Sequence, residues 1–311
     1  MNAGHGRIWQ VGTDMKCNCL VCGEAPAVLH FRAKTKLIPT AYRITEEDHT
    51  PCWDIWRCTR CGFVFSDWKL TDDQLKQLYA SMEDELYDRE EETRRLTFRG
   101  GLSLIDHTRN MPPKGRLMDI GCATGGFLFE ARQRGWDVAG VELSAWAARR
   151  ANTRNLNVYE GTVHSYPDGS ASFDVITMLD YIEHDPEPGL LLDRIRTLLG
   201  PGGLVYITTP DIGGFVARML RAKWWGINPL HLHYFSQATM KKLLEKHGYD
   251  VVISRTYTRV FTIGYWASRL EHFSPALGRA TVKFFTILGL ADKQLKLNLG
   301  DMMEVVARKR A

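Results

Sequence analysis

One strand–turn–helix segment constrains this chain more than any other part of its sequence. Residues 116–120 read as an apolar strand that contains Asp119, residues 121–126 supply the glycines of a tight turn, and a helix follows. A second strand at 137–143 carries an acid, Glu142, near its end. This order predicts a nucleotide-binding βαβ unit, because such a unit places a glycine turn between its first strand and its helix.

The acid Asp119 helps to decide which nucleotide-like cofactor such a turn would bind. The glycine pattern alone does not, since Gly121-x-Ala123-x-x-Gly126 also resembles the dinucleotide fingerprint with its middle glycine replaced. A dinucleotide would bring a pyrophosphate to the turn, where the carboxylate of Asp119 would repel it. S-adenosylmethionine carries an ammonium and a sulfonium group and no phosphate, and Glu142 can accept hydrogen bonds from both of its ribose hydroxyls. The alternatives are a turn-capping Asp119 and an exposed strand-end Glu142; the two acids together favour cofactor binding.

Downstream of this unit the chain alternates strands and helices, as a doubly wound sheet requires. We expect strands at 157–161, 172–180, 202–210 and 249–258, helices at 190–199 and from a Ser236 cap to about residue 247, and a last strand at 301–309. The last strand would enter the sheet antiparallel to its neighbour. The predicted fold class is α/β, a Rossmann-like doubly wound sheet within a domain at 112–311.

Two copies of Cys-x-x-Cys-Gly lie in the first seventy residues, and their thiols are Cys19, Cys22, Cys58 and Cys61. Two thiolates three positions apart can bind one side of a tetrahedral ion, and the glycine that follows allows the chain to turn tightly. Four such ligands form a closed shell with no position for substrate. The pattern therefore predicts a structural Zn²⁺ site in a ribbon over 1–70, against the alternative of unpaired buried cysteines.

The other cysteines near the knuckles, Cys17 and Cys52, lack a partner at this spacing and are not predicted ligands. Neither knuckle has the strand-before, helix-after context of a redox pair. Residues 1–13 lack the pattern of a secretory signal, and no run of about 18 apolar residues occurs. The expected compartment is the cytoplasm, where thiols or metal ligands are expected rather than disulfides.

From Lys114 to Arg310 the ordered motifs resemble class I S-adenosylmethionine-dependent methyltransferases, in particular the group related to ubiquinone-biosynthesis O-methyltransferases. The matching stretches are Asp119-x-Gly121-x-x-x-Gly125, Glu142, Phe173-Asp174-Val175-Ile176, Glu183-His184, Pro201-Gly202-Gly203 and His231-Leu-His233-Tyr-Phe-Ser236. The amino-terminal knuckles look like those that precede the methyltransferase core in sugar C-methyltransferases.

The resemblance implies a cofactor lying over the carboxyl ends of the strands. It assigns Asp119, Gly121 and Gly125 to the methionine part, Glu142 to the ribose, Thr162 and Val163 to the adenine, and Leu179 and Asp180 to the neighbourhood of the methionine group, with Cys122 and Leu143 beside them in the same cofactor-binding set. Two positions depart from the family pattern. Ala123 replaces the middle glycine, and Thr162 or Val163 stands where an acid commonly holds the adenine amine.

A histidine just past the fourth strand, His184, is the predicted general base, because imidazole can accept a hydroxyl proton near neutral pH. The alternative is that Glu183 and His184 fix the loop or shape the pocket. His231 and His233 form a second cluster, for which we expect packing rather than a place in the acceptor pocket. The aromatic residues near them, Trp224, Trp225, Tyr234 and Phe235, would form either an acceptor wall or core.

Two further segments surround the predicted core. Residues 71–111 read as a helical linker or a lid over the site, since Leu75, Leu78 and Tyr79 follow helical spacing. Residues 264–298 read as an insertion of amphipathic helices. We expect the insertion to pack on the core or on a second copy in a homodimer, with a peripheral membrane contact as the alternative.

The leading functional hypothesis is methyl transfer to a small-molecule acceptor, a hydroxyl of a sugar, a lipid-linked saccharide or a natural product. A second is an RNA methyltransferase that uses the ribbon as reader. The net charge of +4 is spread along the chain, and the ribbon lacks basic residues interleaved with aromatic ones, which argues against a nucleic-acid partner. A third is a catalytically silent cofactor-binding scaffold.

Overall fold

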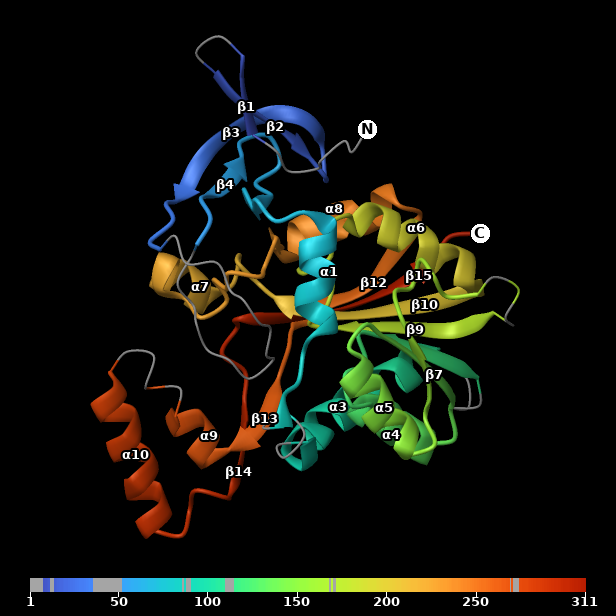
Figure 1. The fold of residues 1–311 in the computed structure, drawn as a ribbon, viewed down its shortest axis with the longest axis vertical. Coiled ribbons are helices and arrows are strands. Elements are labelled where there is room, and N and C mark those ends of the chain that lie inside the picture. The colour runs from blue at the N-terminus through green and yellow to red at the C-terminus, as the bar shows by residue number, and fades with distance from the viewer. Residues whose placement is uncertain are drawn as a thin grey trace.

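A computed structural model describes residues 8–11, 14–35, 52–85, 87, 91–109, 115–167, 169, 172–268, 270 and 274–311. A large central sheet with helices on both faces forms most of the molecule, and a smaller sheet lies at its amino-terminal end (Figure 1). The remaining parts of the predicted ribbon, linker and insertion lie outside the described residues.

The central sheet has seven strands. In sheet order these are β12 (Tyr249–Thr256), β15 (Met302–Lys309), β10 (Leu199–Pro210), β9 (Phe173–Leu179), β6 (Arg116–Ile120), β7 (Asp137–Glu142) and β8 (Asn157–Glu160). Strands β8, β7, β6, β9 and β10 run parallel, whereas β15 is antiparallel to both β10 and β12. The predicted Rossmann-like sheet with an antiparallel last strand is confirmed.

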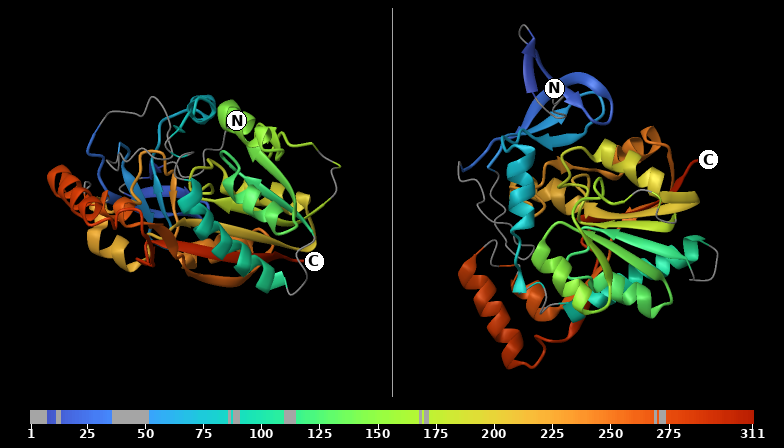
Figure 2. Two further views of the ribbon diagram at one scale, coloured as in Figure 1. Left: turned by 90° about the horizontal axis from the view of Figure 1, so that it is seen from below. Right: turned by 45° about the vertical axis from the view of Figure 1, so that its right-hand side comes forward.

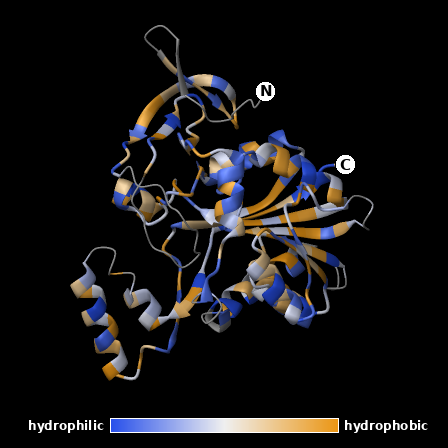
Figure 3. Cartoon of the chain, in the orientation of Figure 1, coloured by the Kyte–Doolittle hydropathy of each residue, from blue (hydrophilic) through white to orange (hydrophobic). Residues whose placement is uncertain are grey.

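Helices cover both faces of this sheet, as Figure 2 shows from two further directions. One face carries α3 (Glu91–Arg109), α4 (Gly126–Gln133) and α5 (Ala145–Thr153), and the other carries α6 (Pro188–Leu198) and α8 (Gln237–Lys246). Successive residues of a strand point to opposite faces. Leu117 therefore packs with α3, α4 and α5, while its neighbour Met118 packs with α6 and α8. The strands are apolar along most of their length, as expected for a parallel sheet buried on both faces (Figure 3).

The amino-terminal sheet has six strands, and one of them comes from the far half of the chain. In sheet order they are β1 (Ile8–Val11), β2 (Asp14–Cys19), β3 (Gly23–Phe31), β4 (Ile55–Cys58), β5 (Val64–Ser66) and β11 (His233–Tyr234). Phe65 pairs with His233 and Val64 with Tyr234. The ribbon is thus hydrogen-bonded to the methyltransferase-like core.

Ribbon and core also share one apolar interior. Phe63 and Phe65 pack in the same buried cluster as Met240 of α8 and Ile176 of the central sheet. Lys246, in the last turn of α8, donates a 2.7 Å hydrogen bond to the carbonyl of Leu20. The ribbon is therefore a fixed part of the molecule that closes one side of the core.

The linker contributes α1 (Asp72–Ala80), which begins with a capping box between Thr71 and Gln74. The insertion contributes α9 (Ile263–Ser268) and α10 (Pro275–Ile287), as its helical periodicity predicts. Two short strands that the sequence did not predict, β13 (Arg259–Thr262) and β14 (Gln294–Leu297), pair at its base. A short helix, α7 (Phe215–Leu220), continues into the 3₁₀ turn Arg221–Lys223.

None of the helices in the described part of the chain combines the length and the apolar character that crossing a membrane requires.

Candidate cofactor and acceptor site

A cavity of about 940 Å³ lies at the carboxyl ends of strands β6, β7 and β9. Ligand sites of small molecules commonly span about 300–1,000 Å³, so this volume is at the upper end of that range. The lining residues that the sequence assigned to the cofactor or to catalysis are Asp119, Gly121, Cys122, Glu142, Leu143, Thr162, Leu179, Asp180 and His184. One continuous space thus brings together the predicted cofactor residues and the predicted base.

Asp119, near the end of β6, faces this cavity from a buried position. Its Oδ1 accepts a 2.6 Å hydrogen bond from the hydroxyl of Thr177 on the neighbouring strand β9. Burial raises the pKa of Asp119 to about 7, and the nearby Glu142 adds to the rise. A carboxyl group in this state is poised to ionise when a cation binds beside it.

Glu142, the last residue of β7, is held by two backbone groups. Its Oε2 accepts a 2.8 Å hydrogen bond from the amide of Ala123, and its Oε1 accepts one of the same length from Ser144. Each carboxylate oxygen has a second lone pair, so the group can still accept hydrogen bonds from a ligand diol. Burial raises the pKa of Glu142, while these amides act in the opposite direction.

The glycine turn that carries Ala123 follows the predicted path, with one strained residue. Ala123 has a φ of 47°, in the left-handed region that favours glycine. Gly121 also has a positive φ, and a Cβ there would lie 2.4 Å from the ring of Tyr181. Glycine at 121 is therefore required both by the backbone and by the aromatic ring that packs on the turn.

Two members of the predicted cofactor set lie away from the cavity surface. Gly125 begins α4, and a Cβ there would meet Leu156 and Ala151 in the helical layer. Val163 is fully buried, and its carbonyl accepts a hydrogen bond from Arg194. The predicted contacts of Gly125 and Val163 with the cofactor stay predictions.

The predicted base His184 lies at the other end of the cavity, beside His231. Nδ1 of His184 is 3.0 Å from the carbonyl oxygen of Leu230 and 3.1 Å from the hydroxyl of Tyr79. A carbonyl can only accept, so Nδ1 carries the proton in this contact and Nε2 carries the basic lone pair. Burial lowers the pKa of His184 to about 4, which keeps the ring neutral at physiological pH.

His231 repeats the same arrangement. Its Nδ1 lies 2.9 Å from the carbonyl oxygen of Gly226, and its ring meets that of His184 edge-on at 4.7 Å between centroids. The contacts place His231 in the cavity wall, contrary to the sequence expectation, while His233 packs in the core against Phe63 as expected. Of the four aromatic residues that follow α7, Trp224 and Trp225 line the cavity, whereas Tyr234 and Phe235 are core.

Sequence reasoning missed a large part of the cavity wall. The residues that it did not assign to the site include Lys76, Met82, Tyr87, Arg94 and Phe98 from the linker, and Arg259, Phe261, Tyr265, Leu297 and Asp301 from the insertion and its base. Asp301 joins these parts, since its carboxylate accepts hydrogen bonds from Arg259 and from the indole of Trp225. The helical spacing of 71–111 suggested a lid, but no local signal marked which of its side chains face inward.

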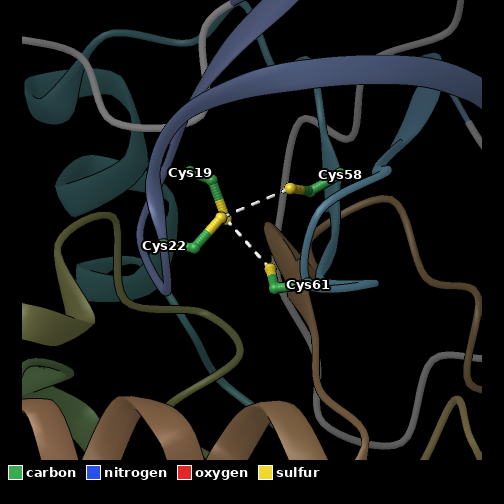
Figure 4. Close-up of side chains that lie close together, drawn as sticks. All are labelled: Cys19, Cys22, Cys58 and Cys61. Atoms are coloured by element: carbon green, nitrogen blue, oxygen red, sulfur yellow. Dashed lines mark hydrogen bonds between the residues drawn. The ribbon is translucent and has the colours of Figure 1, made fainter.

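The four knuckle cysteines converge at the tips of two hairpins in the ribbon (Figure 4). Cys19 Sγ lies 3.4 Å from Cys61 Sγ, Cys22 Sγ lies 3.5 Å from Cys58 Sγ, and the four sulfurs all lie within 4.8 Å of one another. A tetrahedral Zn²⁺ with Zn–S bonds of 2.3 Å would separate its sulfurs by about 3.8 Å. The thiols therefore fit one such ion, and the cluster suggests zinc binding.

The arrangement of the sheet and the site defines a class of protein. The strand order, the glycine turn and the two strand-end carboxyl groups are those of a class I S-adenosylmethionine-dependent methyltransferase. The family model described as "Methyltransferase domain" matches residues 90–254. The chain belongs to this methyltransferase family.

The chain is similar in sequence to curated proteins over part of their length. The chain is 35% identical over 140 residues to a ubiquinone biosynthesis O-methyltransferase of Paraburkholderia phymatum, covering 38% of this chain and 59% of that one. It is 28% identical over 170 residues to the protein of that name from Albidiferax ferrireducens, covering 49% and 67%. The chain thus spans about half the length of several relatives that it matches.

Among solved structures, one similar chain comes from a complex between the Haloferax volcanii Trm112 methyltransferase activator and a methyltransferase. The TM-score is 0.51 at 15% identity, over 73% of this chain and 93% of that chain. At this identity the likeness concerns the fold alone.

Replacing Cys61 by Ser should abolish the metal site, because one thiolate of the closed shell is lost and folding of such ribbons is coupled to metal binding. Elemental analysis of chelator-free protein should give about one zinc per wild-type chain and well below one for the variant. Cys52→Ser, in the same region but outside the cluster, is the matched control and should retain the metal. Equal zinc content in wild type and Cys61→Ser would contradict the site.

Replacing Glu142 by Gln should weaken S-adenosylhomocysteine binding at least about tenfold, because hydrogen bonds to a charged group contribute about 1.5–3 kcal/mol. Isothermal titration calorimetry measures this affinity directly. Glu160, which pairs with Glu142 across the sheet but is exposed, provides the control variant Glu160→Gln. Unchanged affinity in folded Glu142→Gln protein would remove Glu142 from the cofactor site.

Proposed function

We propose that the protein transfers a methyl group from S-adenosylmethionine to a hydroxyl group of a small-molecule acceptor. The observation that carries the proposal is the single cavity that runs from Glu142 to His184. Its volume exceeds what a cofactor of this size needs, so an acceptor can bind beside the cofactor. The names of the curated relatives, O-methyltransferases, support oxygen as the acceptor atom.

The residues around the cavity fit this cofactor. S-adenosylmethionine, when bound, supplies a methyl group that is activated by its positively charged sulfur. The carboxyl groups of Asp119 and Glu142 suit its ammonium and ribose groups, and their position beside the glycine turn disfavours a phosphate ligand. Burial is the largest cause of the raised pKa of both groups.

The charge of the cavity wall supports an uncharged acceptor. Its acidic members are Asp72, Asp119, Glu142, Asp180, Glu183, Asp185, Glu187 and Asp301, against the bases Lys76, Arg94 and Arg259. Burial raises the pKa of several of these acids, among them Asp180 and Asp185. An anionic acceptor would meet repulsion from those that ionise, whereas a neutral hydroxyl compound would not. We therefore propose a neutral sugar, saccharide or polyol-like natural product.

The proposed role of His184 is to accept the hydroxyl proton as the carbon–oxygen bond forms. Its Nδ1 contact with Leu230 orients the ring, so Nε2 is the nitrogen that would receive the proton. The low pKa makes His184 a weak base, but one that is already unprotonated at neutral pH. Tyr79 from α1 contacts the same nitrogen and helps to fix the ring.

Replacing His184 by Gln should lower methyl transfer about 10²–10⁴-fold, the usual contribution of a general base. Production of S-adenosylhomocysteine from S-adenosylmethionine is measured by mass spectrometry with a panel of neutral saccharides and catechols. Affinity for S-adenosylhomocysteine should stay unchanged. His107→Gln, on the outer side of α3, is the control. A rate equal to wild type would remove the base role, and cofactor binding without transfer to any acceptor would favour the silent scaffold.

The lowered pKa of His184 also predicts how the stability of the His184→Gln variant depends on pH. The folded-state pKa of about 4 lies below the ordinary pKa of 6.5 of an unburied histidine. The unfolded chain therefore gains its proton first as the pH falls, and the stability contributed by the neutral ring is lost below the unfolded pKa. Between pH 7 and pH 5, His184→Gln protein should lose about 1–2 kcal/mol less stability than wild type, measured by urea unfolding. An equal loss would contradict the burial of a neutral ring.

The outer side of the insertion carries exposed apolar side chains that could contact a partner. Phe284, Ile287 and Leu288, in and directly after α10, are between 52% and 74% exposed, although the inner residues of the insertion line the cavity. Exposed apolar groups of this kind favour association. A second copy of this chain remains the proposed partner, with a lipid surface as the alternative.

A double substitution, Phe284→Ser with Ile287→Ser, should shift the sedimentation coefficient from that of a dimer to that of a monomer, because it removes two exposed apolar side chains. Val252→Ser, at an exposed apolar position outside the insertion, is the control. Flotation with lipid vesicles separates the alternative. Wild-type protein that is monomeric and floats would replace the dimer with a membrane contact.

A further inference from the structure

A second cavity, distinct from the cofactor and acceptor site, lies between the ribbon and α7. Its volume is about 530 Å³. The ribbon contributes residues such as Phe31, Arg57 and Val64, and the segment around α7 contributes Arg218, Arg221 and Trp224. The proposed methyl transfer uses none of the arginines in this wall.

The wall of this cavity carries positive charge without a matching acid. Arg57, Arg218 and Arg221 line it together with His30, and no aspartate or glutamate of the described chain does so. The nearest acid along the chain, Asp211, is buried and accepts hydrogen bonds from the amide of Gly213, in its own turn, and from the side chain of Gln237 at the start of α8. The pKa of His30 is lowered, first by burial and then by the positive charges of Arg57 and Arg221.

Among these residues, Arg218 and Arg221 give the strongest evidence for a binding site. Both are exposed, and neither forms an ion pair with any other described residue. Arg218 lies in α7 and Arg221 directly follows it, and both side chains line the cavity. Arg57 differs, because it lies beside the Cys58–Cys61 turn, where metal-bound thiolates would balance part of its charge. The two arginines of α7 therefore supply the unbalanced charge.

The backbone of Arg221 gives an independent indication. It ends α7 with a φ of 52° and a ψ of −124°, a conformation that an L side chain rarely adopts and that glycine adopts readily. Backbone strain of this kind concentrates at ligand sites. Arg221 thus holds a charged side chain in a backbone conformation that glycine would adopt without strain. This indicates that its guanidinium group has a function at this position.

We propose that this cavity binds the phosphoryl group of a small molecule, of the size of a diphosphate, through Arg218 and Arg221 with Arg57 opposite them. Guanidinium groups bind phosphate oxygens in pairs of parallel hydrogen bonds, and several arginines converging on one recess suit more than one negative charge. The apolar side chains of Phe31, Val64 and Trp224 also line the recess. A recess of about 530 Å³ suits a small molecule, whereas the backbone of a nucleic-acid strand needs an extended basic track.

The second cavity is next to the cavity of the proposed methyl transfer. Trp224 is buried and lines both cavities, so one indole separates the arginines from the acceptor end of the larger site. The inference stands without the proposed methyl transfer, because it concerns a separate set of residues.

The test is isothermal titration calorimetry of inorganic pyrophosphate into the full-length protein at low salt. We expect saturable binding of one pyrophosphate per chain. Arg218→Gln and Arg221→Gln should each weaken it about tenfold, since a hydrogen bond to a charged group contributes about 1.5–3 kcal/mol. Arg149→Gln, which removes an exposed arginine of α5 outside the cavity, should change nothing. No saturable binding, or equal loss in all three variants, would overturn the proposal.

Two further measurements separate the proposal from its alternatives, a structural role of Arg221 and a nucleic-acid site. Arg221→Gly removes the charge and relaxes the backbone, so it should raise Tm while weakening pyrophosphate binding; a fall in Tm would show that Arg221 is there for structure. A single-stranded RNA oligonucleotide is titrated in parallel. If RNA binds far more tightly than pyrophosphate, with an affinity that falls steeply with salt and depends on Arg149 as well, the site is a nucleic-acid track and the proposal fails.

Discussion

The carboxyl group of Glu142 and its two backbone donors are the contact on which the rest of the site depends. The amides of Ala123 and Ser144 come from the loops after two adjacent parallel strands, and Glu142 joins them at the carboxyl edge of the sheet. This contact fixes the path of the glycine turn, including the left-handed conformation of Ala123. With Asp119 on the adjacent strand it places two buried acids side by side. That charge pattern favours a cationic cofactor and disfavours a diphosphate at this end of the sheet.

The separation of two ligand chemistries within one chain follows from the same electrostatics. Acids dominate the wall of the large cavity, whereas arginines dominate the smaller cavity on the other side of Trp224. The ribbon makes the second cavity possible, because its sheet pairs with the core through β11 and its hydrophobic residues join the core cluster. A ribbon that pairs with the core through a strand and shares its apolar interior is a fixed wall, which a site built between two parts of a chain requires.

The sequence was sufficient for the features that arise from local pattern. The glycine turn, the strand-end acids, the cysteine spacing and the antiparallel last strand each have a signature within a few residues, and the structure places them as expected. Contacts between distant segments have no such signature. Tyr79 meets His184 across 105 residues, and β11 is only two residues long, too short for any periodicity. Gly125 shows a related limit, since its motif position suggested a cofactor contact while its surroundings are those of helix packing.

The most direct test of the central claim compares two ligands on the wild-type protein under one set of conditions. Calorimetric titration with S-adenosylhomocysteine and, separately, with NADH measures which chemistry the strand-end acids accept. We predict saturable binding of one S-adenosylhomocysteine per chain, and we predict that NADH does not displace it. Displacement of bound S-adenosylhomocysteine by NADH at a lower concentration than by S-adenosylmethionine would contradict it.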